Sequence, residues 1–160
     1  MEEKQLNKNP SKVSPELSEE QIQDLVVQAF QAREYAYCPY SDFAVGAALL
    51  AEDGQIYQGC NIENAAYSPS NCAERTAFFK AVSQGERNFS AIAIVGGQKQ
   101  LKYGETKYCA PCGVCRQVML EFCGEDFLII LAEDTDRYQT CRLRELTPFG
   151  FTPEKLLRRF

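Results

Sequence analysis

Two short segments, far apart in the chain, carry the residues that could do chemistry. In the first, Cys72 and Glu74 stand two residues apart at the expected start of a helix. In the second, Cys112 and Cys115 stand three residues apart behind Pro111, at another expected helix start. Three thiolates and one nearby carboxylate are the parts needed to hold a zinc ion with one open coordination position and to move protons beside it. The two segments therefore predict a catalytic zinc centre.

The spacing within the segments supports one shared site. Residues i and i+3 of a helix lie on one face, so the sulfurs of Cys112 and Cys115 can reach the same ion, with Cys72 as the third ligand. Helix N-termini carry partial positive charge, which favours the thiolate form. Hydrogen bonds from Arg75 or Arg116 could offset the remaining negative charge on sulfur. We favour Arg75, because it lies on the helix that begins at Cys72.

Two structural interpretations compete with the catalytic one. Glu74 could be the acidic residue of a capping box that begins at Asn71. Cys109 could complete a closed four-cysteine structural zinc site together with the other three thiols. Against the second interpretation, Pro111 restricts Ala110 to an extended conformation, which tends to hold Cys109 away from the helix start.

The composition narrows the classes of protein to which the chain can belong. A length of 160 residues indicates one domain, which we expect over residues 18–160, after a flexible tail at residues 1–17. The sequence contains no histidine, so serine or cysteine catalysis with an imidazole base is excluded. The net charge of -5 disfavours nucleic acid and anionic membranes as partners.

The sequence contains eight cysteines, which are many for its length, and their state depends on the compartment. The sequence begins with a mostly polar stretch that does not resemble a signal peptide, and no apolar run approaches the roughly 18 residues that a membrane span needs. We therefore expect a cytoplasmic protein, in which the thiols stay reduced and serve as metal ligands or small core residues.

The elements that must position these residues alternate between helix and strand. Ser18 begins a capping box with Gln21, and Asp53-Gly54 is a tight-turn signal. The expected elements are, in order, helix 18–35, strands 43–51 and 55–62, helix 72–84, strand 90–96, helix 111–123, strand 127–132, edge strand 138–143 and a short helix at 154–159. This order predicts an α/β fold in which helices cover both faces of a sheet.

Two features of the expected hairpin concern packing and binding. Gly46, which is followed by Ala47, indicates that a helix or a ligand packs very close to the first strand. Asn61 and Glu63 lie at i and i+2 near the end of the second strand, so their side chains point to the same side. An amide beside a carboxylate can bind the vicinal hydroxyls of a ribose, and a polar strand end that faces water would have the same pattern.

The motifs carry a resemblance to a known family. The sequence resembles the cytidine deaminases of the small, homotetrameric class over nearly everything after about residue 16. The resemblance implies a three-layer α/β/α sandwich with a mixed five-stranded sheet. It also implies zinc-dependent hydrolysis of cytidine and deoxycytidine to uridine and deoxyuridine, with release of ammonia. The matching segments are Cys38–Leu50, Gly59–Tyr67, Cys72–Thr76, Pro111–Gln117, and Glu145–Pro148 with Phe151.

The resemblance implies a role for each residue of the predicted zinc centre. Cys72, Cys112 and Cys115 would bind one zinc ion per chain, which activates a water. Glu74 would take the proton of that water and deliver it to the base and then to the leaving amine. Arg75 resembles the arginine that compensates the charge of the thiolates in this family.

The resemblance also implies contacts with the substrate, a free pyrimidine nucleoside. The backbone at Ala73 would contact the pyrimidine, and Phe43 would pack on its ring. Asn61 and Glu63 would hold the ribose hydroxyls, which agrees with their expected position on the strand.

Two further residues, Tyr67 and Phe151, resemble those that complete the active site of a neighbouring subunit. The likeness implies a homotetramer with shared active sites. One departure from the family pattern lies beside Phe151, where Phe149-Gly150 replaces a more usual small polar pair.

Three alternative functions are open at this point. A related deaminase could act on a pyrimidine-like antibiotic or on a nucleotide, although no basic cluster beside the motifs indicates a phosphate pocket. A non-enzymatic binding module could be stabilised by a four-cysteine zinc site. Editing of a polynucleotide would require salt-sensitive binding to single-stranded RNA or DNA.

Overall fold

The computed structural model describes residues 16–157, apart from the side chain of Leu157. Of the expected tail at residues 1–17, only Glu16 and Leu17 fall within the described residues, and they precede the first helix. The division of the chain into a tail and one domain stays a prediction. Within the described residues the expected order of helices and strands is confirmed, with one short helix added near the C-terminus.

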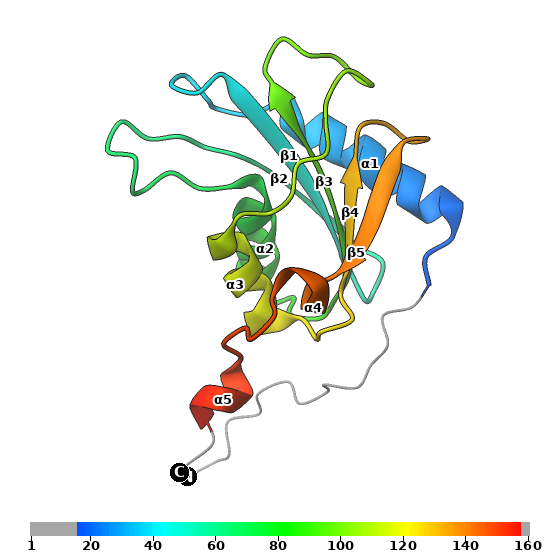
Figure 1. Ribbon diagram of the computed structural model, residues 1–160, viewed down its shortest axis with the longest axis vertical. Helices are drawn as coiled ribbons and strands as arrows, with labels where there is room; N and C mark the ends of the chain where they lie inside the picture. The colour runs from blue at the N-terminus through cyan, green and yellow to red at the C-terminus, as the bar shows by residue number, and fades with distance from the viewer. Residues whose placement is uncertain (1–15, 158–160) are drawn as a thin grey trace.

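A mixed sheet of five strands forms the middle of the molecule (Figure 1). Its strands lie in the order β2-β1-β3-β4-β5. β3 and β4 run parallel, and the other neighbours run antiparallel. The predicted mixed five-stranded sheet is thus confirmed. The strands are β1 (Phe43–Ala51), β2 (Ile56–Cys60), β3 (Phe89–Gln98), β4 (Leu128–Ala132) and β5 (Tyr138–Arg142).

Helices cover both faces of this sheet, as predicted (Figure 1). Strand alternation sends Leu49 and Ile94 to one face, where they pack with α2 (Ala73–Ser83) and α3 (Gly113–Phe122). It sends Leu50 and Val95 to the other face, where they pack with α1 (Glu19–Arg33). The central strands are therefore buried on both sides, which explains why β3 reads as a nearly continuous apolar run.

Two glycines let the helices approach the sheet closely. A Cβ on Gly46 would lie 2.0 Å from the backbone oxygen of Ala29 in α1. A Cβ on Gly59 would lie 2.4 Å from the backbone nitrogen of Ala77 in α2. The close neighbour that Gly46 predicts is therefore a helix. In the same way, the missing side chain of Gly59 on β2 lets α2 pack directly against the sheet. α2 carries part of the predicted zinc centre.

The termini of the helices follow local sequence signals. Ser18 accepts a hydrogen bond from the backbone of Gln21, and the Gln21 side chain accepts one from the backbone of Ser18, so the predicted capping box is confirmed. Two short helices lie beyond the edge strand β5. α4 (Leu143–Leu146) was not expected from the sequence, whereas α5 (Pro153–Leu157) was expected. None of the helices described between residues 16 and 157 is long and apolar enough to span a membrane.

Candidate metal centre

Two of the predicted ligands occupy the same position on two different helices. Cys72 is the N-cap of α2 and Cys112 is the N-cap of α3, both with extended backbone. Neither residue makes a side-chain capping hydrogen bond. Each sulfur is therefore free to bind metal at a helix N-terminus, where the partial positive charge of the uncapped N–H groups favours thiolate. The sequence predicted Asn71 as the N-cap of α2, which is one residue too early. It predicted Pro111 as the first helical residue of α3, which is two residues too early. Both details were wrong.

The three sulfurs lie close enough to share one ion. Sγ of Cys72 lies 3.8 Å from Sγ of Cys112, and Sγ of Cys112 lies 3.5 Å from Sγ of Cys115. All three sulfurs lie within 4.8 Å of one another, and no other such group of potential ligands occurs among the residues that the structure describes. A tetrahedral zinc ion about 2.3 Å from each sulfur holds them about 3.8 Å apart. The donor set thus fits zinc, with a fourth position left for water or substrate.

Arg75 is the cation that faces these sulfurs. Its Nη2 donates to Sγ of Cys72 at 3.6 Å and to the backbone oxygen of Ser70 at 3.1 Å. Hydrogen bonding to Cys115, and then to Arg75, lowers the pKa of Cys72 to about 5. The Nε of Arg75 is buried and has no protein hydrogen-bond partner. A guanidinium turned toward sulfur can offset the negative charge of a three-thiolate site.

The other arginine considered from the sequence has a different role. Arg116 donates to the backbone oxygen of Pro111 at 2.8 Å and to that of Leu146 at 3.1 Å. These bonds tie the segment before α3 to the end of α4. Arg116 therefore holds the ligand-bearing loop in place and does not contact sulfur.

Glu74 lies in the first turn of α2 with only 4% of its surface exposed. Burial raises the pKa of its carboxyl to about 7, and the charge of Cys72 acts in the same direction. Such a carboxyl can both accept and release a proton near neutral pH. The capping-box alternative is wrong, because the helix begins at Cys72 and the Asn71 amide donates to Oγ1 of Thr76.

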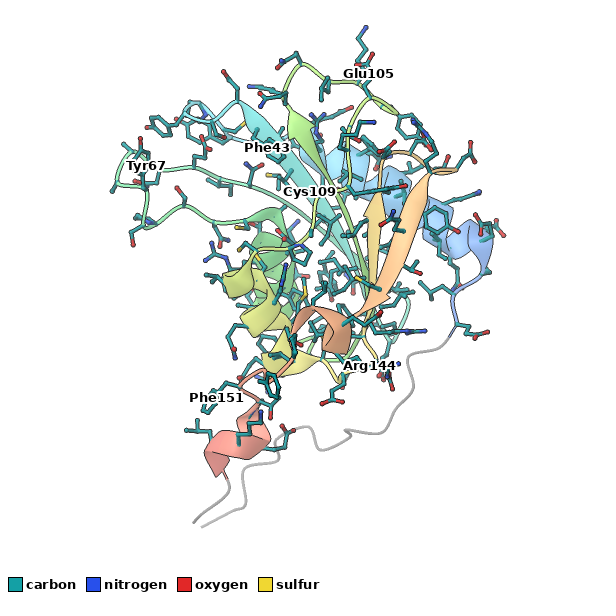
Figure 2. The ribbon with its side chains drawn as sticks, viewed as in Figure 1. Phe43, Tyr67, Glu105, Cys109, Arg144 and Phe151 are labelled. Carbon is teal, nitrogen blue, oxygen red and sulfur yellow. The ribbon has the colours of Figure 1, made fainter. Side chains whose placement is uncertain are left out.

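Cys109 stands outside the group of three sulfurs. A Cβ on Gly96 would lie 2.8 Å from Sγ of Cys109 and 3.3 Å from Cε1 of Phe43, so both side chains pack over this glycine (Figure 2). Burial raises the pKa of Cys109 to about 11 and keeps its thiol neutral. The arrangement disfavours a closed four-cysteine site and makes Cys109 a neighbour of the Phe43 ring.

Asn61 and Glu63 both make hydrogen bonds within the chain. Asn61 donates from Nδ2 to the oxygen of Phe43 and accepts at Oδ1 from the nitrogen of Val45, each at 2.8 Å. Glu63 accepts from the hydroxyl of Ser41 at 2.5 Å and from the backbone nitrogen of Tyr40 at 2.9 Å. The hydrogen bond from Ser41 lowers the pKa of Glu63, with a further contribution from the backbone of Tyr40. Both side chains are therefore held in fixed orientations.

The remaining predicted substrate contacts, Ala73, Tyr67 and Phe151, differ in burial. Ala73 is fully buried directly after Cys72 at the start of α2. Tyr67 and Phe151 are exposed and lie on separate projections of the molecule (Figure 2). Tyr67 lines a surface hollow of about 300 Å³ together with Tyr40, Ser41, Glu63 and Ser70. Within one chain the structure does not bring Phe151 to this hollow.

Sequence reasoning missed two residues that orient the site. Oγ1 of Thr76 donates to the backbone oxygen of Cys72 at 3.1 Å and so braces a ligand. Ser41 holds Glu63. The Thr76 contact follows a recognisable helical spacing of four residues, whereas the Ser41 contact depends on how two loops meet and has no signal in the sequence.

Comparisons with known proteins agree with this geometry. The family model for the cytidine and deoxycytidylate deaminase zinc-binding region matches residues 19–131. A cytidine deaminase of Sporosarcina psychrophila is 50% identical over 135 residues, which cover 84% of this chain and 94% of that protein. A cytidine deaminase of Halalkalibacterium halodurans is 48% identical over 134 residues, which cover 84% of this chain and 96% of that protein.

Solved structures show the same likeness. The crystal structure of cytidine deaminase from Burkholderia pseudomallei has a TM-score of 0.71 and 43% identity, and the match covers 80% of this chain and 97% of that one. Cytidine deaminase from Mycobacterium tuberculosis has a TM-score of 0.67 and 39% identity, and the match covers 80% of this chain and 94% of that one. The fold and the three-thiol centre define a zinc-binding deaminase. The chain belongs to the cytidine and deoxycytidylate deaminase family.

Proposed function

We propose that this chain hydrolyses free cytidine and deoxycytidine to uridine and deoxyuridine, releasing ammonia. The observation that carries the proposal is the convergence of three thiols, at the spacing of one zinc ion, beside a buried carboxyl. The cytidine deaminases that are 50% and 48% identical to the chain support this choice of substrate. The established family membership supports the reaction type.

Cys72, Cys112 and Cys115 would hold the zinc ion, one per chain. When bound, zinc supplies Lewis-acid activation, which lowers the pKa of a water in the fourth coordination position. Arg75 and the N-termini of α2 and α3 reduce the negative charge on the sulfurs, so that activation is not lost to three thiolates.

Glu74 carries the proton. It takes a proton from the attacking water and passes it to N3 of the cytosine ring. The water oxygen forms a bond to C4, and Glu74 then moves the remaining proton of the new C4 hydroxyl to the amino group on C4. The bond between C4 and this nitrogen breaks as the C4 carbonyl forms, and ammonia leaves. A pKa of about 7 suits a group that must act first as base and then as acid.

The residues around the centre bind the nucleoside. The Phe43 ring packs on the pyrimidine, and the peptide groups at Ala73 contact its edge. Asn61 and Glu63 bind the ribose hydroxyls, and their internal hydrogen bonds support this role because they fix both side chains before substrate arrives. The hollow that Glu63 lines has no cationic residue in its wall, which favours a nucleoside over its phosphate ester.

The active form is a homotetramer in which Tyr67 and Phe151 complete the sites of neighbouring chains. Tyr67 and Phe151 are 72% and 56% exposed in the single chain. This exposure supports the proposal that a neighbouring chain covers both side chains on assembly. The enzyme acts in the cytoplasm in pyrimidine salvage. All eight cysteines are free thiols, which suits this reducing compartment.

An absorbance assay of cytidine with wild-type protein and the Glu74→Gln variant tests the function. We expect the variant to keep one zinc ion per chain while turnover falls by roughly 10²–10⁴-fold, the range for loss of a positioned acid–base group. Glu121→Gln, an exposed change on α3, is the matched control and keeps full activity. Equal rates in the wild type and in Glu74→Gln would remove Glu74 from the mechanism. A zinc-loaded wild type without activity on cytidine would refute the substrate.

A further inference from the structure

Arg33, the last residue of α1, reaches across the end of the sheet and binds only backbone. Its Nε donates to the oxygen of Ala44 at 3.0 Å, and its Nη1 donates to the oxygen of Leu101 at 3.0 Å. Its Nη2 donates to the oxygens of Gly97 and Gln98 at 3.2 and 2.7 Å. One guanidinium thus joins the start of β1, the end of β3 and the connection that follows β3.

The geometry of these bonds is specific to arginine. A guanidinium presents five donors in a planar fork, whereas a lysine ammonium presents three donors at one point. The partly buried side chain stays charged while it satisfies four carbonyl oxygens. Gly46 allows the approach, because a Cβ there would lie 2.8 Å from Cβ of Arg33.

The segment that Arg33 holds includes the backbone of Phe43. The Ala44 oxygen binds Arg33, while the Phe43 oxygen and the Val45 nitrogen bind the side chain of Asn61. Three consecutive residues are therefore fixed by two polar side chains from different elements. The backbone that carries the Phe43 ring is therefore fixed, and the ring lies over Gly96.

The other carbonyls held by Arg33 lie on the path from the sheet to the metal centre. Gln98 and Leu101 begin the connection that carries Cys109 and then reaches Cys112. Cys109 packs over Gly96 beside Phe43. Arg33 therefore bonds to the backbone of both segments that meet over Gly96: β1, which carries the Phe43 ring, and the connection that carries the Cys109 thiol.

We propose that Arg33 is a positioning residue for the nucleoside base, which it holds in place through Phe43 without touching the substrate. The inference rests on the proposed function, in which the pyrimidine packs on the Phe43 ring. Binding of the base would then also depend on a residue of α1, the helix on the face of the sheet opposite the zinc ligands.

A double-mutant cycle on KM for cytidine tests this role. The four proteins are the wild type, Arg33→Lys, Phe43→Ala and the double variant, each assayed for KM, kcat and bound zinc. We expect Arg33→Lys to raise KM about tenfold while kcat stays within about threefold, because packing on the ring serves ground state and transition state alike. Zinc content stays at one per chain. The double variant has the KM of Phe43→Ala alone, because Arg33 acts through the ring.

A matched control separates positioning from stability. Arg142 also donates to a backbone oxygen, that of Asp126 at 2.8 Å, but at the β5–α4 junction. Arg142→Lys should lower the melting temperature without changing KM. If Arg33→Lys behaves like Arg142→Lys, Arg33 is only a structural residue and the proposal is overturned.

The remaining outcomes also decide the question. KM effects of Arg33→Lys and Phe43→Ala that multiply in the double variant would show that Arg33 does not act through the ring. An unchanged KM in Phe43→Ala would instead refute the base contact of the proposed function. If Arg33→Lys does not fold, Arg33→Gln is taken through the same cycle, and failure of both to fold would overturn a role confined to substrate positioning.

Discussion

Cys72 and Cys112 stand where most helices have a serine, threonine or aspartate. A side chain at this position normally accepts a hydrogen bond from the first turn, and neither cysteine does so. The helix ends are therefore organised for a metal ion rather than for local capping. This use of the N-cap also explains why capping preferences alone placed both helix starts one or two residues too early.

Cys109 offers a direct test of the open coordination position. In the structure its thiol packs over Gly96 and is kept neutral by burial. We expect Cys109→Ser to retain one zinc ion per chain, as measured by metal analysis of the purified protein. It should also retain deaminase activity in the absorbance assay. Cys115→Ser, which removes one of the three sulfurs, is the comparison and should lose zinc. Loss of zinc from both variants would support a four-cysteine site.

Glu63 makes stability depend on pH in acid. Hydrogen bonds from Ser41 and Tyr40 lower its pKa below the ordinary value of 4.5, so folding favours the carboxylate. This stabilisation is fully present above the unfolded pKa and is lost as pH falls through the folded pKa. Glu63→Gln should therefore unfold at lower urea than the wild type at pH 7, and the two should converge well below pH 4.5. A constant difference across this range would contradict the assignment.

At the scale of elements, the position of α2 depends on Gly59. A Cβ at this position would lie 2.4 Å from backbone atoms of Ala73 and Ala77. Because α2 carries Cys72 and Glu74, a shift of this helix would also move the metal centre.

We expect Gly59→Ala to lower the free energy of unfolding by about 1–3 kcal/mol through overpacking. It should also weaken zinc binding, as measured by chelator competition. Gly124→Ala is the control, because no atom lies within 4 Å of its added Cβ, and it should change stability by no more than about 0.5 kcal/mol. Equal stability of the two variants would show that α2 can adjust without strain.

The strands were more predictable from the sequence than the contacts between elements. β1 matches its expected bounds, and the other strands differ by one or two residues at an end, because apolar runs and the Asp53-Gly54 turn mark them. The four-residue helix α4 has no periodic pattern long enough to detect. The role of Arg33 could not be predicted, because its partners are carbonyl oxygens that every residue has.

At the scale of the whole molecule, several aromatic side chains face outward. Phe149 is fully exposed and has a φ of 65°, in the left-handed region that favours glycine. Phe151, two residues further on, is also exposed. Large apolar groups on a strained, exposed segment are consistent with a surface that is covered on assembly.

The proposed sharing of active sites between chains predicts complementation between two defective variants. Glu74→Gln lacks the proton carrier but keeps Phe151, and Phe151→Ala has the opposite defect. After the two are mixed, dissociated and reassembled, we expect activity well above the sum of the separate variants, because some sites then combine an intact Glu74 with a neighbour's Phe151. Native mass measurement should show mixed tetramers. Mixed assemblies with merely additive activity would mean that each chain forms its site alone.

The exposure of Cys112 has a consequence for the lifetime of the enzyme. This ligand is open to solvent, and its sulfur lies 3.5 Å from that of Cys115. A mild oxidant that removes two electrons from the two zinc-bound thiolates would join their sulfurs in a disulfide and release the ion, and a dithiol reductant with fresh zinc would reverse the change. Oxidation of this pair would therefore remove two of the three sulfurs of the metal centre, so the working state of the protein depends on the thiol balance of its surroundings.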